Sequence, residues 1–412
     1  KEGHTIEKQH VISSISRALT SDQDWPEILT IAKTEDLQLV VSNTTEVGIN
    51  FDGKDQIDAK PPQSFPGKLA VFLYERYRHF SGSPESGLTI LPCELITDNG
   101  NRLREIILQL AQHWGLELGF SKWIERSNQF SNSLVDRIVT GRPTPGRVEQ
   151  YWKRLGYRDE LISVGEPYAL WAIEGYKSLS DQLGFPKCQT EIIIKPDIMP
   201  YRKRKIRLLN GAHTSSASLG FLCGYDTVLE IMKSPLLSSF VETLIRHEIS
   251  LGLDLDNAET ECFVDQVLDR FRNPFLRHQL LDITFQSTLK WRLRVLPSIL
   301  SFQQKTGQLP PRLMLGFASY LLFMRSIEQK DGKFFGHRKD SPYLILDDEA
   351  LYFHQVWKEV TNNNRSDLLP LVDQICSETR LWGSDLTLLP GFVEIVLDSL
   401  TDPQQQLERL TK

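Results

Sequence analysis

Residues 205–213 place an amine, an amide and an imidazole close together, in the order Lys-x4-Asn-x2-His. At about 100° per residue of α-helix, Asn210 lies roughly 140° from Lys205, and His213 falls between them at roughly 80°. The three polar side chains therefore share one broad face, and helical side chains lean towards the N-terminus, which brings Asn210 and His213 closer to Lys205. This arrangement predicts a base that deprotonates an alcohol beside a donor that holds the resulting oxygen.

Each of these residues also has an ordinary structural explanation. Lys205 ends a basic run at residues 202–205, and such runs are usually solvated. A single histidine on a helix is usually a structural hydrogen-bonding group. The pair Asn210-Gly211 is typical of a turn, which would end the helix before His213. The residue types alone leave these alternatives open.

The wider sequence resembles the polyol-specific long-chain dehydrogenases, the mannitol dehydrogenase family. The resemblance rests on ordered blocks that extend over almost the whole chain, beginning with KIRLLNGAHT at residues 205–214. The other blocks are VSNTTE at 41–46, LPCE at 91–94 leading to NG at 99–100, VDRI at 135–138, EPY at 166–168 with Trp171, RFRNP at 270–274, and DLT at 385–387 with PG at 390–391. In its detailed sequence the chain most resembles the hexuronate-reducing branch of the family. The segments that carry this resemblance are SNTTEVGI, PCELI, VDRIVTG and RFRNPFLRHQLL.

The resemblance implies a metal-independent transfer of a hydride between a nicotinamide cofactor and a carbon of a sugar acid. It implies that Lys205 is the general acid/base, that Asn210 and Asn99 donate hydrogen bonds to the reacting oxygen, and that His213 orients the substrate. A lysine with its usual pKa of about 10.4 is a poor base at neutral pH. We therefore expect neighbouring cations and burial to lower the pKa of Lys205.

The resemblance also implies where the cofactor binds. Asn43, Thr44, Thr45 and Glu46 follow a strand-like run and are expected to line the nicotinamide side of NAD, with NADP left open. A strand-to-helix cap is the alternative for these residues, and both roles can hold together. Asp136 is expected to bind a substrate hydroxyl or the cofactor ribose, with an ion pair as the alternative.

A hexuronate or hexonate carries a carboxylate, so a site for it needs a cation that can bind this group. The candidate substrate-binding residues are Lys290, Arg292, Arg277 and His278. Lys290 and Arg292 belong to a segment, residues 290–294, that holds three cations. The alternative is an amphipathic helix with exposed basic residues.

Strand-like and helix-like segments alternate in the first half of the chain, at residues 37–41, 69–77, 88–91 and 103–114. This alternation predicts a parallel α/β sheet. The polar clusters at 43–46 and 94–99 follow two of the strands, and parallel sheets bind ligands beyond the carboxyl ends of their strands. Helical periodicity dominates from about residue 198. We therefore predict a Rossmann-like domain over residues 1–196 and a mostly α-helical substrate and catalytic domain over residues 197–412.

No G-x-G-x-x-G turn occurs anywhere in the sequence. Dinucleotide-binding folds normally carry this turn at their first strand, where the pyrophosphate approaches a helix N-terminus. The family resemblance offers an explanation, because Lys1 aligns well inside the first domain of the family. We therefore expect the opening strand, its glycine turn and the next strand to be missing from this chain.

The overall composition argues against several other classes of protein. A net charge of −6 over 412 residues argues against nucleic-acid binding, despite the basic run. The apolar stretch at residues 313–324 is too short to span a membrane and predicts a buried helix. The five cysteines are scattered without metal-site spacing, which favours a reduced, cytoplasmic protein without a metal.

Two alternatives to a hexuronate reductase stay open at this point. One is a family member that acts on a different hexuronate or on a polyol such as mannitol or arabinitol. The other is a sugar-acid or nucleotide sensor without catalytic activity, built on a dehydrogenase scaffold. The expected partner in every case is a small molecule, and the sequence does not predict the oligomeric state.

Overall fold

A computed structural model describes residues 6–45, 47–185, 191–253, 257–339, 341–360, 362 and 364–411. The chain divides into two compact units between Arg202 and Lys203. This division lies six residues beyond the predicted boundary at 196/197. Of the predicted site residues, Glu46 lies outside the described residues.

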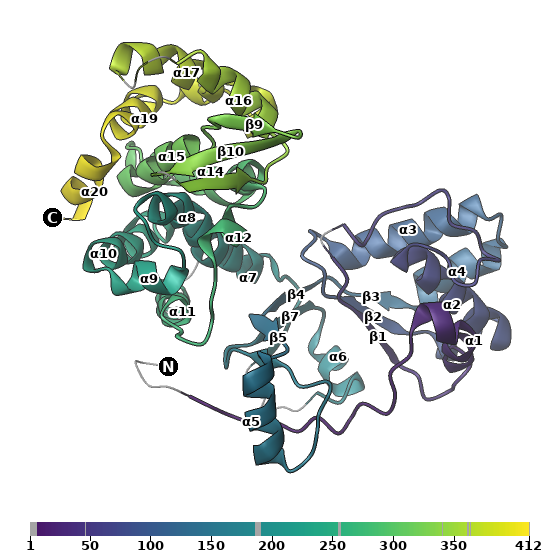
Figure 1. Ribbon diagram of the computed structural model, residues 1–412. Helices are drawn as coiled ribbons and strands as arrows, with labels where there is room; N and C mark the ends of the chain where they lie inside the picture. The colour runs from purple at the N-terminus through teal and green to yellow at the C-terminus, as the bar shows by residue number, and fades with distance from the viewer. Residues whose placement is uncertain are drawn as a thin grey trace. The chain divides into compact units, whose positions relative to one another are not determined.

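The first unit is an α/β structure in which helices and strands are mixed along the chain (Figure 1). Its helices are α1 (Ser21–Ile31), α2 (Phe65–His79), η1 (Pro84–Ser86, a 3-10 turn), α3 (Asn99–His113), α4 (Leu118–Ser127), α5 (Pro145–Leu155), α6 (Lys177–Gln182) and the start of α7 (Met199–Arg204). Its strands are β1 (Leu39–Ser42), β2 (Thr89–Pro92), β3 (Gln129–Phe130), β4 (Ser133–Asp136), β5 (Val139–Gly141), β6 (Val164–Gly165), β7 (Leu170–Glu174) and β8 (Ile192–Lys195).

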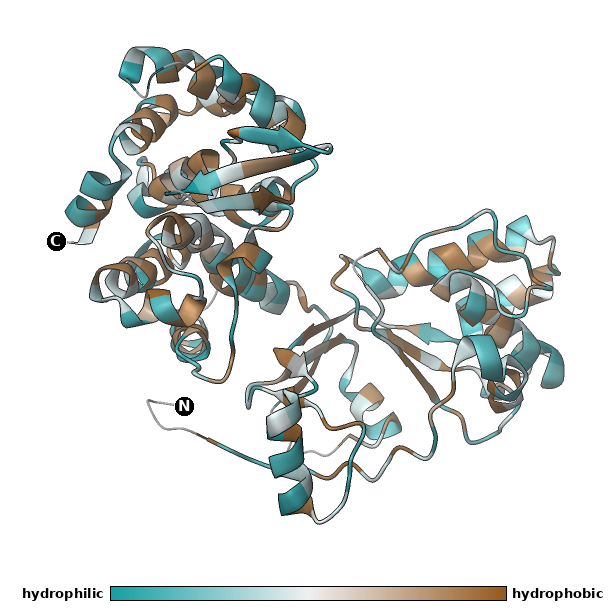
Figure 2. Ribbon diagram, in the orientation of Figure 1, coloured by the Kyte–Doolittle hydropathy of each residue, from teal (hydrophilic) through white to brown (hydrophobic). Residues whose placement is uncertain are grey.

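Strands β1, β2 and β3 form a parallel sheet in that order, with Leu39 opposite Thr89. Its strands are largely apolar, as Figure 2 shows. Helices usually cover a parallel sheet and bury its strands, which favours apolar residues there. Leu69 and Leu73 of α2 and Leu103 and Ile107 of α3 belong to the buried core beside it. A second sheet has the order β4-β7-β8, in which β4 and β7 are antiparallel and β7 and β8 are parallel. Strands β5 and β6 form an antiparallel pair.

The second unit is mostly helical. Its helices are α8 (Ala212–Leu222), α9 (Val228–Lys233), α10 (Pro235–Thr243), α11 (Asn257–Phe271), α12 (Leu280–Thr284), α13 (Ser287–Lys290), α14 (Leu296–Thr306), α15 (Pro311–Phe323), α16 (Ala350–Lys358), α17 (Arg365–Ser377), α18 (Thr379–Trp382), η5 (Leu386–Leu388, a 3-10 turn), α19 (Phe392–Thr401) and α20 (Pro403–Thr411). Among the residues of this unit that the structure describes, three segments are π-helices: η2 (Lys205–Gly211), η3 (Leu244–Ile249) and η4 (Trp291–Val295). Strands β9 (Glu328–Lys330), β10 (Lys333–Arg338) and β11 (Ser341–Ile345) form an antiparallel sheet.

Helices α8 and α15 form the centre of this unit. Nearly every residue of α15 is buried, which confirms the predicted buried helix. A Cβ atom on Gly316 would lie 2.5 Å from the carbonyl oxygen of Ser215, so only glycine allows α15 to approach α8 this closely. No helix of the described residues is both long and apolar enough to cross a membrane.

The structure answers one question that the sequence left open. The Asn210-Gly211 pair does not form a turn, because η2 runs directly into α8 and both have helical backbone angles at their junction. His213 therefore continues the helical segment that begins before Lys205. The predicted regular α-helix is replaced over seven residues by a π-helix.

Candidate functional site

The side chains of Lys205 and Asn210 point in more similar directions from the π-helix η2 than they would from an α-helix. In a π-helix, backbone hydrogen bonds join residues five apart, and these two residues are five apart. A π-turn therefore places them on nearly the same side, whereas an α-helix would separate them by about 140°. Lys205 is 8% exposed. The amine and the amide thus share one side of the helix.

Asn210 and Arg207 contribute buried polar atoms to η2 that have no hydrogen-bond partner among the described residues. These atoms are Oδ1 of Asn210 and Nη1 of Arg207. Burial lowers the pKa of Arg207 to about 10. Buried polar atoms normally find a partner, so an unpaired one is a candidate for contact with a ligand or a water molecule.

His213 is buried among rings at the start of α8. Its imidazole stacks on Phe271 with ring centroids 4.1 Å apart and meets His278 edge-on at 4.8 Å. Burial is the main cause that lowers the pKa of His213 well below its usual value, and the nearby His278 lowers it further. The imidazole is therefore neutral at neutral pH, so it can both donate and accept a hydrogen bond.

Three cations also act on His213. Arg270, Arg294 and Lys290 each contribute to the lowered pKa of the imidazole. Lys290 Nζ donates a hydrogen bond to the carbonyl oxygen of Ile283 at 2.9 Å. We call His213, His278, Lys290, Arg270 and Arg294 the histidine–cation cluster.

The helices that carry the histidine–cation cluster pack tightly. A Cβ atom on Gly211 would lie 3.2 Å from the carbonyl oxygen of Arg294, so the end of η2 lies against η4. The start of α8, which carries His213, is therefore held at a fixed distance from the segment with Lys290 and Arg294.

The cluster contains two of the four predicted carboxylate-binding residues, His278 and Lys290. Arg292 is exposed and its Nη1 donates to the carbonyl oxygen of Arg380 at 3.5 Å, and Arg277 is also exposed. Helical spacing explains the difference for Arg292, because a residue two positions from Lys290 points to roughly the opposite side in an α-helix and in a π-helix alike.

Arg270 was not among the predicted substrate-binding residues, and Arg294 was predicted only as one of the three cations of residues 290–294. Arg294 stands four residues after Lys290 and therefore shares its helical face, which is a signal that the spacing already carried. Arg270 lies in the RFRNP block, directly before the Phe271 that stacks on His213. No local pattern indicates that stack, because 58 residues of sequence separate its two rings.

In the first unit, Glu94 binds the turn that follows β1. Its buried carboxylate accepts hydrogen bonds from Ser42 Oγ at 3.0 Å, from the backbone N–H of Thr44 at 3.0 Å and from Thr44 Oγ1 at 2.8 Å. The predicted cofactor residues Asn43 and Thr44 are therefore held from the end of the neighbouring strand β2. Glu94 itself was not among the predicted site residues.

Asn99 is fully buried, and its side chain is engaged within this unit. Nδ2 lies 2.8 Å from the carbonyl oxygen of Pro92, 3.0 Å from that of Glu94 and 3.0 Å from that of Ser133. Oδ1 accepts from the N–H groups of Gly100 and Ser133. An amide group has two N–H donors. Donation from Asn99 to a reacting oxygen stays a prediction, and it requires one of these contacts to be released.

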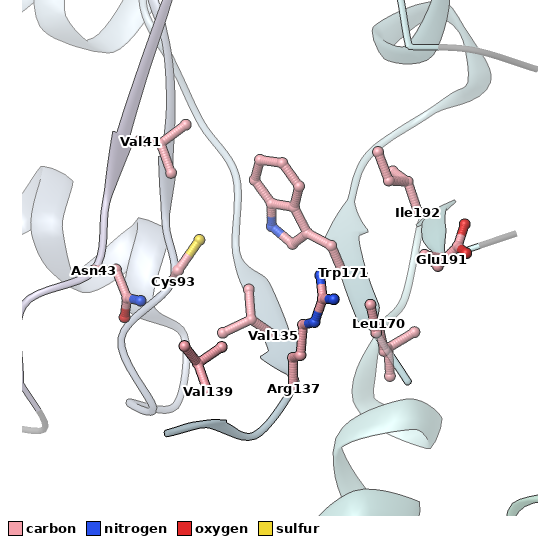
Figure 3. Close-up of a pocket in the computed structure, with 11 residues that line it drawn as sticks. Val41, Asn43, Cys93, Val135, Arg137, Val139, Leu170, Trp171, Glu191 and Ile192 are labelled. Carbon is pink, nitrogen blue, oxygen red and sulfur yellow. The ribbon is translucent and has the colours of Figure 1, made fainter. Parts of the chain in front are cut away.

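A cavity of about 420 Å³ is lined by residues at the carboxyl ends of β1 and β2 and by residues of β4, β5, β7 and β8 (Figure 3). Its walls are mostly apolar, and Figure 3 shows the thiol of Cys93 and the indole of Trp171 facing the same space as the Arg137 side chain. Burial raises the pKa of Cys93 to about 11, so the thiol is neutral. Asn43 supplies a polar group at the rim.

Asp136 is buried at the end of β4, 4% exposed. The following residue, Arg137, donates from Nε to the carbonyl oxygen of Glu166 at 3.0 Å and lines the cavity. Asp136 is therefore placed beside the cavity wall, and its predicted contact with a ligand stays a prediction. Thr45 is exposed and follows the turn that Glu94 holds.

The cavity has the size of a small-molecule site. Its volume falls in the range of about 300–1,000 Å³ that is usual for small-molecule sites. It combines apolar walls with the polar side chains of Asn43, Arg137 and Glu191. Among the described residues, no group of three or more histidine, cysteine or acidic side chains could hold a metal ion.

Comparisons with known proteins cover both units. The family model described as the mannitol dehydrogenase Rossmann domain matches residues 2–187, and the model described as the mannitol dehydrogenase C-terminal domain matches residues 197–402. These matches confirm the predicted fold class, a Rossmann-like domain followed by a mostly helical one.

Several curated relatives share the name altronate oxidoreductase. The relative from Yersinia enterocolitica is 38% identical over 97% of this chain and 81% of its own length. The relative from Cronobacter sakazakii is 39% identical over 97% of this chain and 81% of its own length. The relative from Bacillus subtilis is 38% identical over 96% of this chain and 78% of its own length.

Two solved structures have a similar fold. The ternary complex of Pseudomonas fluorescens mannitol 2-dehydrogenase with NAD and D-mannitol matches with a TM-score of 0.68 and 22% identity, over 97% of this chain and 79% of that chain. Substrate-free D-sorbitol dehydrogenase matches with a TM-score of 0.71 and 20% identity, over 93% of this chain and 77% of that chain.

Proposed function

The chain belongs to the mannitol dehydrogenase family, and on that premise we propose that it is an NAD-dependent oxidoreductase that interconverts altronate and tagaturonate. The curated relatives named altronate oxidoreductase, an activity also called tagaturonate reductase, support the choice of substrate. The observation that carries the proposal is the polar series Lys205, Asn210 and His213, which continues into a cluster of cations.

Each residue of the series has a defined part in this proposal. Bound NAD supplies the group that accepts the hydride. Lys205 takes the hydroxyl proton of the substrate at Nζ during oxidation and returns it to the forming alkoxide during reduction. Asn210 donates to the reacting oxygen, and loss of one such donor costs roughly 3 kcal/mol of barrier. The neutral imidazole of His213 hydrogen-bonds a neighbouring hydroxyl.

The histidine–cation cluster favours an acidic substrate over a neutral polyol. Lys290 lies near His213 together with Arg270 and Arg294. A carboxylate bound to such cations forms charge-assisted hydrogen bonds, which are stronger than those of a hydroxyl group. We therefore propose that Lys290, with Arg294 or Arg270, binds the carboxylate of the hexonate.

The first unit supplies the cofactor site in this proposal. Asn43, Thr44 and Thr45 line the nicotinamide side, and Asp136 contacts the ribose or a substrate hydroxyl. NAD is the proposed cofactor, with NADP left open. We place the reaction in the cytoplasm, because the described cysteines Cys93, Cys223, Cys262 and Cys376 are all free thiols.

Turnover of altronate, mannonate and mannitol by the full-length protein with NAD tests this function. We expect altronate to give the highest kcat/KM. A preference for mannonate would make the protein a fructuronate reductase, and a preference for mannitol or arabinitol would make it a polyol dehydrogenase of the same family. Absence of turnover with every hexonate and polyol, together with retained binding of NADH or a sugar acid, would favour a sensor.

Substitution of the base separates catalysis from binding. Lys205→Met should lower kcat by at least 10²-fold, the usual contribution of a general acid/base, while the Kd for NADH changes little. Lys203→Met is the matched control, because Lys203 lies two residues earlier and is exposed. Equal kcat values of Lys205→Met and Lys203→Met would show that Lys205 is not the general acid/base.

A further inference from the structure

We infer that Glu94 is a positioning residue, which holds the turn after β1 in the shape that binds the nicotinamide end of the cofactor. This inference rests on the proposed function, because it concerns the same cofactor site. Glu94 is 2% exposed and lines no part of the cavity itself. It acts through the preceding residue, Cys93, which lines the cavity, and through the turn that it holds.

The carboxylate suits this position because it meets only donors. Ser42 Oγ, Thr44 N–H and Thr44 Oγ1 all point at its two oxygens, at 2.8–3.0 Å. An ionised carboxylate is an acceptor only. A glutamine would replace one oxygen by an NH2 group. When this group faces Ser42 Oγ, which can accept as well as donate, the contact is kept with its direction reversed, and the charge-assisted hydrogen bonds of the carboxylate become weaker neutral ones.

The backbone of Glu94 ties a second loop to the same point. Its carbonyl oxygen accepts from Ile96 N–H at 2.7 Å and lies 3.0 Å from Asn99 Nδ2. Asn99 also contacts the backbone of Ser133 at the start of β4. Glu94 therefore connects segments next to three strands, β1, β2 and β4.

Two cavity residues depend directly on this connection. Asn43 lies between Ser42 and Thr44, the two residues that donate to the carboxylate. Cys93 directly precedes Glu94, and its N–H donates to the carbonyl oxygen of Ser42 at 2.7 Å. A change at Glu94 should therefore alter both the rim and the wall of the cavity in Figure 3.

The same unit offers a matched control. Asp55 is 1% exposed and its carboxylate accepts from the N–H groups of Gln63 and Ser64 and from Ser64 Oγ. It resembles Glu94 in burial and in its set of three donors, but neither Asp55 nor its partners line the cavity. Asp55→Asn therefore reports what the loss of any buried carboxylate does to the unit.

The first test is binding of NADH to the full-length protein, followed by fluorescence or calorimetry. We expect Glu94→Gln to raise the Kd for NADH at least tenfold and Asp55→Asn to change it less than twofold. Thr44→Val removes one hydroxyl donor and should raise the Kd by about threefold. Equal affinities of wild type, Glu94→Gln and Thr44→Val would overturn the inference. If Glu94→Gln does not fold, Thr44→Val and Ser42→Ala decide.

The second test needs no cofactor. The rate at which iodoacetamide alkylates Cys93 in the free protein, followed by site-resolved mass spectrometry, reports how firmly the turn is held. We expect at least a fivefold faster reaction in Glu94→Gln and no change in Asp55→Asn. An unchanged rate in Glu94→Gln contradicts the inference. If wild type fails to bind NADH, the proposed function fails, whereas the alkylation rates still decide whether Glu94 holds the turn.

Discussion

The imidazole of His213 lies nearly parallel to the ring of Phe271, with centroids 4.1 Å apart and an angle of 17° between the planes. This stack removes one face of the imidazole from water, and His278 covers it from another side. Burial disfavours the charged imidazolium, which is why the pKa of His213 falls. The residue therefore serves the proposed site as a neutral hydrogen-bonding group.

The lowered pKa predicts how stability depends on pH. Below about pH 6.5 the unfolded chain binds a proton at His213 and the native protein does not. The free energy of unfolding should therefore fall as the pH drops below 6.5, by up to about 1.4 kcal/mol per pH unit for this group. His278, whose pKa is lowered as well, adds to the effect.

Urea unfolding at pH 7.5 and pH 5.5 measures this dependence. Wild type should lose stability between the two values, and His213→Gln should lose clearly less. His247→Gln is the control, because His247 is exposed in the same unit. The same loss in wild type and in His213→Gln would contradict a buried, neutral imidazole.

Substitution of Lys290 should affect substrates with and without a carboxylate differently. Lys290→Met is expected to raise KM for altronate by about 10- to 100-fold, which corresponds to the roughly 1.5–3 kcal/mol of a hydrogen bond to a charged group. KM for mannitol, where it is turned over, should rise much less. Arg292→Met should change neither constant, because Arg292 points to the carbonyl oxygen of Arg380. If Arg292→Met raised KM for altronate more than Lys290→Met did, the carboxylate would bind at Arg292 and not at Lys290.

The contrast between Lys290 and Arg292 shows which features of the site can be predicted from local sequence patterns. Helical spacing separates these two cations and groups Lys290 with Arg294. The alternation of strands and helices likewise predicts the parallel sheet and the ends of β1 and β2 as a ligand site. Patterns of this kind depend on neighbours within about one helical turn or one strand.

Other features depend on contacts between distant residues. Glu94 and Ser42 are 52 residues apart, and no local pattern pairs them. No local repeat in the sequence predicts the π-helix over Lys205 and Asn210 either. This segment, η2, packs against two further π-helices, η3 and η4. Tertiary packing decides such details, and they in turn determine how Lys205 and Asn210 face each other.

Gly211 should limit how closely the catalytic helix can approach η4. A methyl group there would lie 3.2 Å from the carbonyl oxygen of Arg294, so η2 and η4 must separate by a few tenths of an ångström. Gly211→Ala gains up to about 1 kcal/mol of helix propensity and loses about 1–3 kcal/mol through overpacking. Stability should therefore fall by up to about 2 kcal/mol. The value of kcat/KM should fall several-fold, because Asn210 and His213 move relative to Lys290.

Gly146→Ala is the control for this substitution. Gly146 lies in α5, and a Cβ atom on it would meet nothing within 4 Å. The variant should be as active as wild type and equally or slightly more stable. Steady-state kinetics and thermal unfolding of both variants measure the two effects, and full activity of Gly211→Ala would show that the contact with Arg294 is unimportant.

Arg76 should be a stability residue of the first unit without a part in catalysis. It is 1% exposed on α2, and its guanidinium donates to the carbonyl oxygens of Ser86, Ala32, Thr34 and Leu37 at 2.6–3.2 Å. Its four acceptors lie before β1 and before β2, so this side chain joins the segments that lead into both strands.

Arg76→Met leaves these carbonyl groups without their donor, at a cost of about 1–3 kcal/mol for each one that stays unsatisfied, and should lower the free energy of unfolding by about 3 kcal/mol or more. Arg76→Lys should cost less, because an ammonium group keeps the charge but cannot reach all four oxygens from one point. Arg78→Met, two residues later and exposed on the same helix, should change stability by no more than about 0.5 kcal/mol. Chemical unfolding of the three variants tests this order. A similar loss in Arg76→Met and Arg78→Met would mean that the four carbonyl contacts do not hold the strand entrances together.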